Sequence, residues 1–141
     1  MLHLADYYRG ETALGDLLGE SGVVDLYLRA LSMGSADAAL ALGFMYKNGE
    51  LVVKNTRVSY DYFVQAAALG NHQALLHLAY AHMIGNGVQQ SYNLAKDYYL
   101  QAAEHNLEGG FLGLGYLYEF GLGLPVNKAA AQSFYELAAN H

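Results

Sequence analysis

The sequence predicts an all-α fold made of stacked helical hairpins, and three observations support this prediction. From residue 36 onward the chain repeats itself at an interval of 36 residues without gaps. Each copy holds two segments whose apolar residues recur at helical spacing. Residue types that begin and end helices fall at the same place in every copy. A repeat period between about 20 and 50 residues is typical of solenoids and similar arrays.

The repeat is visible in equivalent residues of three consecutive units. The aligned sets are Leu42, Leu78 and Leu114; Gly43, Ala79 and Gly115; Tyr46, His82 and Tyr118; Gly49, Gly85 and Gly121; Tyr62, Tyr98 and Phe134; Phe63, Tyr99 and Tyr135; and the alanine pairs that begin at Ala66, Ala102 and Ala138. We therefore expect one solenoid domain over residues 1–141, with three repeats at 36–71, 72–107 and 108–141 and a partial repeat at 1–35.

Each repeat is expected to contain two helices. The first helices are placed near 36–47, 72–83 and 108–119, and the second helices near 56–69, 92–105 and 128–141. The residues before the second helices, which are good N-caps, are Asn55, Ser91 and Asn127. The residues after a second helix, whose types tolerate the left-handed conformation, are Gly34, Gly70 and Asn106. The small residue at Gly43 and its equivalents is expected to let the two helices of a hairpin approach closely. The alanine pairs on the second helices are expected to serve the same contact.

The first 35 residues are expected to form a fourth, degenerate unit. The pattern Leu4-Ala5-x-x-Tyr8 imitates a first helix, and Val24 to Gly34 imitates a second helix. The loop between them, from Arg9 to Gly22, is two residues longer than in the other units, and a short helix over Leu14 to Leu18 is an alternative within it.

These motifs resemble a known repeat family. The pattern Leu-Gly-x-x-Tyr at 42–46 and 114–118 is similar to the first helix of tetratricopeptide repeats, whose unit is about 34 residues long. The extra length lies in a glycine-rich loop, at 85–88 and 121–124, and the Ala-x-x-Tyr-Tyr-x-x-Ala-Ala that follows at 95–103 resembles Sel-1-like repeats. The sequence departs from the pattern at Leu51, where a different turn is expected, and at His82, which replaces a core tyrosine.

The resemblance implies a fold and a function. The fold is a right-handed α-α superhelix of hairpins whose first helices line a concave groove. The function is that of a protein–protein interaction adaptor or scaffold that holds a segment of a partner protein, since Sel-1-like proteins serve as assembly platforms in endoplasmic-reticulum degradation complexes and in bacterial signalling and host interaction. No enzymatic activity and no cofactor are expected.

The positions that would face such a groove form a helical stripe on each first helix. The candidate partner-binding residues are Leu40, Phe44, Lys47, Leu76, His77, Tyr80, Met83, Leu112, Tyr116 and Glu119. Among them Phe44, Tyr80 and Tyr116 form an aromatic ladder with one ring per unit. The alternative is that the leucines and aromatics of this stripe are core residues that pack between neighbouring helices.

Composition and motifs argue against several other functions. Only 14% of the residues are charged, against about 25% in a typical domain, and the net charge is −6. The seven Lys and Arg residues form no basic stripe, which argues against nucleic acids and anionic membranes as partners. The chain has no cysteine, no phosphate-binding loop and no nucleophile–base set. The periodic acids Asp25, Asp61 and Asp97 are interpreted as a solvated outer face.

The histidines predict packing rather than metal binding. His72, His77 and His82 are spaced by five residues, whereas two ligands on one helix face need a spacing of three or four. His82 stands at a core position, and His105 and His141 stand at helix ends, where a cation is favoured.

Two alternatives to an adaptor remain. The last helix is as apolar as the internal ones, including Phe134 and Leu137, which predicts either a longer Sel-1-like array, for example an endoplasmic-reticulum degradation adaptor, or a homodimer through a terminal hairpin. Small-ligand binding is less expected. The Sel-1-like relatives that bind β-lactam compounds resemble a variant with paired cysteines, and this chain has no cysteine. The sequence contains no signal peptide, so the default compartment is the cytoplasm, or the endoplasmic-reticulum lumen or periplasm for a fragment.

Overall fold

The computed structural model describes the backbone of residues 12–140, and the side chains from residue 22 to residue 140. Within that range the chain forms seven α-helices and no strand, as the sequence predicts. The chain divides into two compact units, residues 1–71 and residues 72–141. The boundary between the units coincides with the boundary between two of the predicted repeats.

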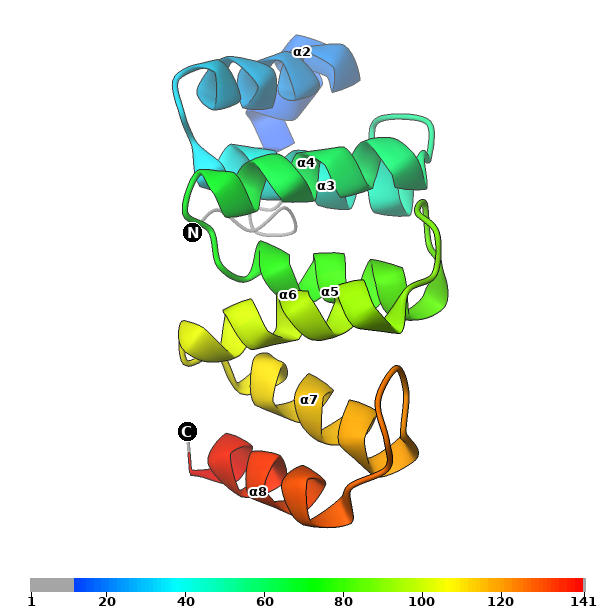
Figure 1. Cartoon of the computed structure of the whole chain (residues 1–141). Coiled ribbons are helices and arrows are strands. Elements are labelled where there is room, and N and C mark those ends of the chain that lie inside the picture. Colours follow the sequence, from blue (N-terminus) through cyan, green and yellow to red (C-terminus); the bar gives the residue numbers. More distant parts are fainter. Residues whose placement is uncertain (1–11, 141) are drawn as a thin grey trace. The chain divides into compact units, whose positions relative to one another are not determined.

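The first unit contains α2 (Thr12–Ser32), α3 (Ala36–Asn48) and α4 (Thr56–Ala68). The helices α3 and α4 run antiparallel as one hairpin, and α2 packs on α3 (Figure 1). One cluster of buried residues in this unit consists of Val23, Tyr27, Ala38, Ala41, Leu42 and Met45. The repeat leucine and the small residues around it therefore form the core of the hairpin.

The second unit contains two hairpins. The first pairs α5 (Ala74–Ile84) with α6 (Tyr92–Glu104), and the second pairs α7 (Glu108–Phe120) with α8 (Lys128–Ala139) (Figure 1). The helix α6 also packs along α7, which joins the hairpins. The large apolar side chains buried in this unit are Leu75, Leu78, Leu114 and Leu117.

The helix boundaries follow from the caps that the sequence predicts. The side chains of Asn55, Ser91 and Asn127 accept hydrogen bonds from the backbone N–H three residues later, at 3.1, 3.2 and 2.9 Å. Each bond satisfies a donor that the first turn of a helix would leave unpaired. The expected left-handed residues Gly34, Gly70 and Asn106 have φ of 91°, 104° and 59°. These predictions are confirmed.

The first inter-helix loop does not take the different turn that was expected at Leu51. Leu51 has a φ of 66°, close to the values of 81° and 75° at the equivalent Gly87 and Gly123. The left-handed conformation is unfavourable for a residue with a branched side chain. Leu51 is packed against the core of the first unit, and this burial offsets the backbone cost.

In two of the three hairpins a glycine of the first helix makes room for an aromatic ring. A Cβ atom at Gly43 would lie 2.6 Å from the Phe63 ring, and one at Gly115 would lie 2.6 Å from the Tyr135 ring. The prediction that this small residue allows close approach is therefore confirmed, and the group that approaches is the ring of the second helix.

The N-terminal prediction is wrong in part. The segment expected as a loop from Arg9 to Gly22 is helical from Thr12, and the alternative helix over Leu14 to Leu18 is part of α2, which continues to Ser32. Glycine inside a helix costs about 1 kcal/mol relative to alanine, which weakens a helix but does not end it. The first-helix pattern at Leu4, Ala5 and Tyr8 lies outside the described residues, so a fourth repeat there stays a prediction.

Candidate functional site

A set of stacked, mostly half-buried rings joins the two helices within each hairpin. The ring pairs Tyr46–Tyr62, His82–Tyr98 and Tyr118–Phe134 are nearly parallel, with centroids 5.6, 5.9 and 5.6 Å apart. His82 is buried, and its Nδ1 lies 3.1 Å from the carbonyl oxygen of Gln89. The prediction that His82 packs in place of a core tyrosine is confirmed.

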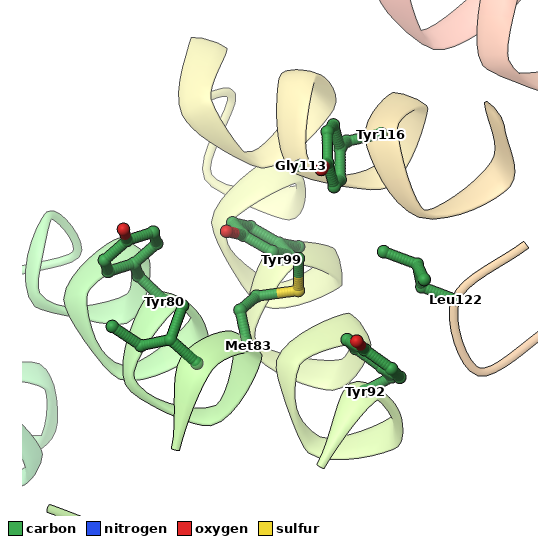
Figure 2. Close-up of a pocket in the computed structure, with 8 residues that line it drawn as sticks. Tyr80, Met83, Tyr92, Tyr99, Gly113, Tyr116 and Leu122 are labelled. Carbon is green, nitrogen blue, oxygen red and sulfur yellow. The ribbon is translucent and has the colours of Figure 1, made fainter. Parts of the chain in front are cut away.

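The second unit contains a pocket of about 460 Å³ between α5, α6 and α7 (Figure 2). Its lining residues are Tyr80, Met83, Ile84, Tyr92, Tyr99, Gly113, Tyr116 and Leu122. Pockets that hold small-molecule ligands usually measure about 300–1,000 Å³. This pocket is therefore large enough for one or two side chains of a partner. We refer to it below as the tyrosine pocket.

Two glycines allow the tyrosine pocket to form. Gly113 of α7 presents no side chain to Tyr99 of α6, and a Cβ atom there would lie 2.4 Å from the Tyr99 ring. Gly123 in the α7–α8 loop approaches Tyr92, and its Cβ would lie 2.7 Å from the Tyr92 Cβ. The ring of Tyr99 thus lies directly against the backbone of α7, and Tyr92 lies against the α7–α8 loop.

The pocket presents neutral aromatic groups. Tyr80 is 52% exposed and Tyr116 is 47% exposed, so both rings are accessible, while Tyr99 is partly buried. Burial raises the pKa of Tyr99 above its ordinary value of 10, and the nearby Tyr80 phenol raises it further. None of the eight lining residues is an Asp, Glu, Lys, Arg or His. The pocket can therefore offer ring faces, phenol groups and apolar contacts.

Of the candidate residues in the second unit, the structure brings Tyr80, Met83 and Tyr116 together at the tyrosine pocket. Leu112 lies on the same helix as Tyr116 and is 44% exposed. Leu76 and His77 are partly buried, and the Leu76 side chain contacts α7 at Gly109.

Glu119, the last candidate in this unit, is engaged by α8. Its Oε1 accepts a hydrogen bond of 2.7 Å from the Tyr135 hydroxyl. Burial, this hydrogen bond and the charge of Glu119 together raise the pKa of Tyr135 to about 12. The Glu119 carboxylate thus contributes to the α7–α8 hairpin, in addition to any contact with a partner.

The candidate residues of the first unit are less accessible. Leu40 is only 1% exposed, so it is a core residue here and offers no surface to a partner. Phe44 is partly buried, and its ring packs edge-on against Phe63 with centroids 5.4 Å apart. Lys47 is partly buried as well. An aromatic ladder that runs from Phe44 to Tyr80 and Tyr116 stays a prediction.

Sequence reasoning did not place five pocket residues in the site: Ile84, Tyr92, Tyr99, Gly113 and Leu122. Tyr99 was interpreted only as a core aromatic. A signal existed for Tyr92, because the equivalent residues of the other repeats are Thr56 and Lys128. An aromatic residue that appears in one repeat alone is more informative about function than one that recurs.

Two histidines, His72 and His105, form a stacked pair that the sequence did not predict. The rings of His72 and His105 stack with centroids 3.5 Å apart and an angle of 10° between their planes. Stacked rings direct their nitrogen lone pairs outward in parallel planes, which is unsuitable for sharing one metal ion. Among the described residues no group of three or more His, Cys, Asp or Glu side chains could hold a metal ion.

The family model of the Sel1 repeat matches residues 36–71, 72–107 and 112–141. The chain belongs to the Sel1 repeat family. The first two matched segments have the boundaries of the predicted repeats, while the third begins at 112 instead of 108. Sel1 repeats generally mediate protein–protein interactions, and the family generally provides scaffolds rather than enzymes.

Solved structures of Sel1 repeat proteins resemble this chain. A protective antigen of uropathogenic Escherichia coli, c5321, is 28% identical with a TM-score of 0.81, over 86% of this chain and 26% of the antigen. A Sel1 repeat protein from Oxalobacter formigenes is 29% identical with a TM-score of 0.70, over 77% of this chain and 43% of that protein. Helicobacter pylori cysteine rich protein B is 22% identical with a TM-score of 0.64, over 86% of both chains, and supports the fold alone.

This Sel1 repeat chain thus spans about a quarter of the first of these proteins and under half of the second. A search of curated proteins found no match. Among the described residues, no helix combines the length and the apolar character that crossing a membrane requires.

Proposed function

We propose that this Sel1 repeat protein is an adaptor that holds a segment of a partner protein against the first helices α5 and α7. The observation that carries the proposal is the tyrosine pocket, flanked by the half-exposed rings of Tyr80 and Tyr116. Tyrosine and methionine are favoured at protein interfaces, because they supply large contact areas with few rotatable bonds or with an adaptable side chain. Solenoids use such surfaces to bind extended or helical segments.

The adaptor function can be tested by crosslinking followed by affinity measurement. The photoreactive residue p-benzoylphenylalanine at position 116 should capture the partner in the cell of origin, and the same residue at position 100 should not. Leu100 is a suitable control because it is exposed to a similar degree, 41%, but does not line the tyrosine pocket. The crosslinked protein is then identified by mass spectrometry and purified.

With the purified partner, the double change Tyr80→Ala and Tyr116→Ala should raise the Kd at least about tenfold. Aromatic side chains at interface centres often contribute more than about 1.4 kcal/mol each to the binding free energy. The change Leu100→Ala should leave the Kd nearly unchanged. Calorimetry measures both values, and circular dichroism checks that the variants remain helical. An unchanged Kd for the double variant would exclude the tyrosine pocket as the partner site.

A second candidate function is self-association through α8. Leu137 is 50% exposed on this helix and stands where the other repeats have Gln65 and Gln101. The alanine pair of α8, Ala138-Ala139, is equivalent to Ala102-Ala103 on α6. On α6 this pair packs closely against α7, since a Cβ at Gly110 would lie 2.5 Å from the Ala103 nitrogen. A second copy, or a further repeat in a longer array, would cover α8 in the same way.

The change Leu137→Gln, which restores the residue of the other repeats, tests self-association. We expect the wild-type chain to increase in mean mass with concentration in light scattering, and the variant to remain monomeric at the same concentrations. A wild-type chain that stays monomeric at millimolar concentration would contradict this second candidate and would leave the adaptor function untouched.

A further inference from the structure

We propose that the tyrosine pocket binds a cationic side chain, an arginine, of the partner segment. This inference rests on the proposed adaptor function and specifies the chemistry that the same site recognises. Three features of the second unit support it: the aromatic rings around the pocket, the excess of acidic residues in the unit, and the neutral phenol groups at the pocket wall.

The first feature is the set of tyrosine rings around the pocket. Four of the eight lining residues are tyrosines, Tyr80 on α5, Tyr92 and Tyr99 on α6 and Tyr116 on α7, and they surround the space from three helices (Figure 2). The face of an aromatic ring carries negative electrostatic potential and attracts ammonium and guanidinium groups. Among the described residues of the first unit, the Arg57 guanidinium carbon makes such a contact, 5.8 Å from the centroid of the Tyr60 ring.

The charge of the second unit favours a cation. Residues 72–141 contain five carboxylates and two lysines, and no arginine. The acidic residues are Asp97, Glu104, Glu108, Glu119 and Glu136. Neither lysine, Lys96 or Lys128, lines the tyrosine pocket. The unit therefore repels an acidic segment and attracts a basic one, while the pocket contains no cation of its own that would compete for the rings.

The shape and polarity of the pocket favour arginine over lysine. A guanidinium is planar, stacks on aromatic rings and presents five hydrogen-bond donors, whereas an ammonium is a compact and strongly hydrated charge. The phenol oxygens of the lining tyrosines can accept hydrogen bonds from these donors. Met83 adds a polarizable sulfur that suits contact with the side-chain stem.

The test uses the whole chain, labelled with ¹³C at its tyrosine rings, and three small probes followed by NMR. The probes are the N-acetyl N-methylamides of arginine, of citrulline, which has nearly the same shape without the charge, and of norleucine, which is apolar. We expect the arginine probe to shift the resonances of Tyr80, Tyr99 and Tyr116 in a saturable way. The stacked pair Tyr46 and Tyr62 of the first unit, which does not line the tyrosine pocket, provides the internal control and should not shift.

The arginine probe should bind with a Kd at least about fivefold lower than that of either neutral probe, and the preference should decrease as salt is raised toward 1 M, because salt screens the attraction. The variant Tyr116→Phe keeps the ring face and should keep the preference within about twofold. The variant Tyr116→Leu keeps apolar bulk without a ring, and its preference for arginine should decrease.

Two results would overturn the inference. The first is equal or tighter binding of the norleucine or citrulline probe, which would make the pocket a site for an apolar or neutral side chain. The second is the absence of saturable shifts at the pocket tyrosines with the arginine probe. These comparisons use the wild-type chain, so misfolding of a variant does not affect them. If a partner is crosslinked at position 116 but either of these results is found, the proposed adaptor function is retained and the proposed preference for arginine is rejected.

Discussion

We expect replacement of Leu114 by alanine to lower the free energy of unfolding of the second unit by about 3 kcal/mol. Leu114 is 1% exposed in α7, and its equivalents Leu42 and Leu78 are buried in the same way. Truncating a buried leucine removes the transfer free energy of three carbon atoms and leaves a cavity, which together cost about 2–5 kcal/mol. Urea unfolding followed by far-UV circular dichroism and by hydrogen exchange in α7 measures the loss.

Leu112→Ala is the matched control, because Leu112 lies two residues earlier on the same helix and is 44% exposed. The cost of this change should stay within about 0.5 kcal/mol, as for most surface substitutions. Equal losses for the two variants would contradict the burial of α7 described above. A large loss for Leu112 alone would show that this residue is a core residue and not part of a partner surface.

The repeat made most of the fold predictable from the sequence. Helix caps depend on a few neighbouring residues, so Asn55, Ser91 and Asn127 could be identified without any tertiary information. The core position of His82 followed from the same alignment, since a residue at a repeat position inherits the packing of its equivalents.

The prediction was weaker wherever a residue departed from the local rule. The glycines near the start of α2 were interpreted as a loop, yet the chain stays helical through them. Leu51 was expected to change the turn, yet it adopts the glycine conformation. A local preference of this kind amounts to about 1 kcal/mol. At Leu51 the packing against the core of the first unit offsets it, and a sequence pattern does not contain that contribution.

The site was predictable only in part for a related reason. Tyr80 and Tyr116 were found because they fall on one helix face, but the pocket also needs Tyr99 and the bare backbone at Gly113. Equivalent repeat positions also differ in exposure: the first leucine of the stripe, Leu40, is buried, whereas Leu112 is exposed. The exposure of a side chain in a solenoid depends on the units next to its own, and the repeat pattern alone does not show which residues those units place against it.

The second large effect is expected at Gly110, where alanine should destabilise the second unit by about 2 kcal/mol. Gly110 is buried at the contact of α7 with α6, and a Cβ there would lie 2.5 Å from the Ala103 nitrogen and 2.9 Å from the carbonyl oxygen of Tyr99. These are backbone atoms of α6, so the helices would have to separate. Overpacking of this kind costs about 1–3 kcal/mol, which exceeds the gain of up to about 1 kcal/mol from helix propensity.

Gly109→Ala provides the control on the same turn of α7. A Cβ at Gly109 would meet only the end of the flexible Leu76 side chain, 2.7 Å away, and that side chain can move. This variant should therefore match or slightly exceed the wild type in urea unfolding. Separation of α6 from α7 in Gly110→Ala should also move Tyr99 away from Gly113 and alter the tyrosine pocket. A Gly110→Ala chain as stable as Gly109→Ala would show that the two helices are not held together at this point.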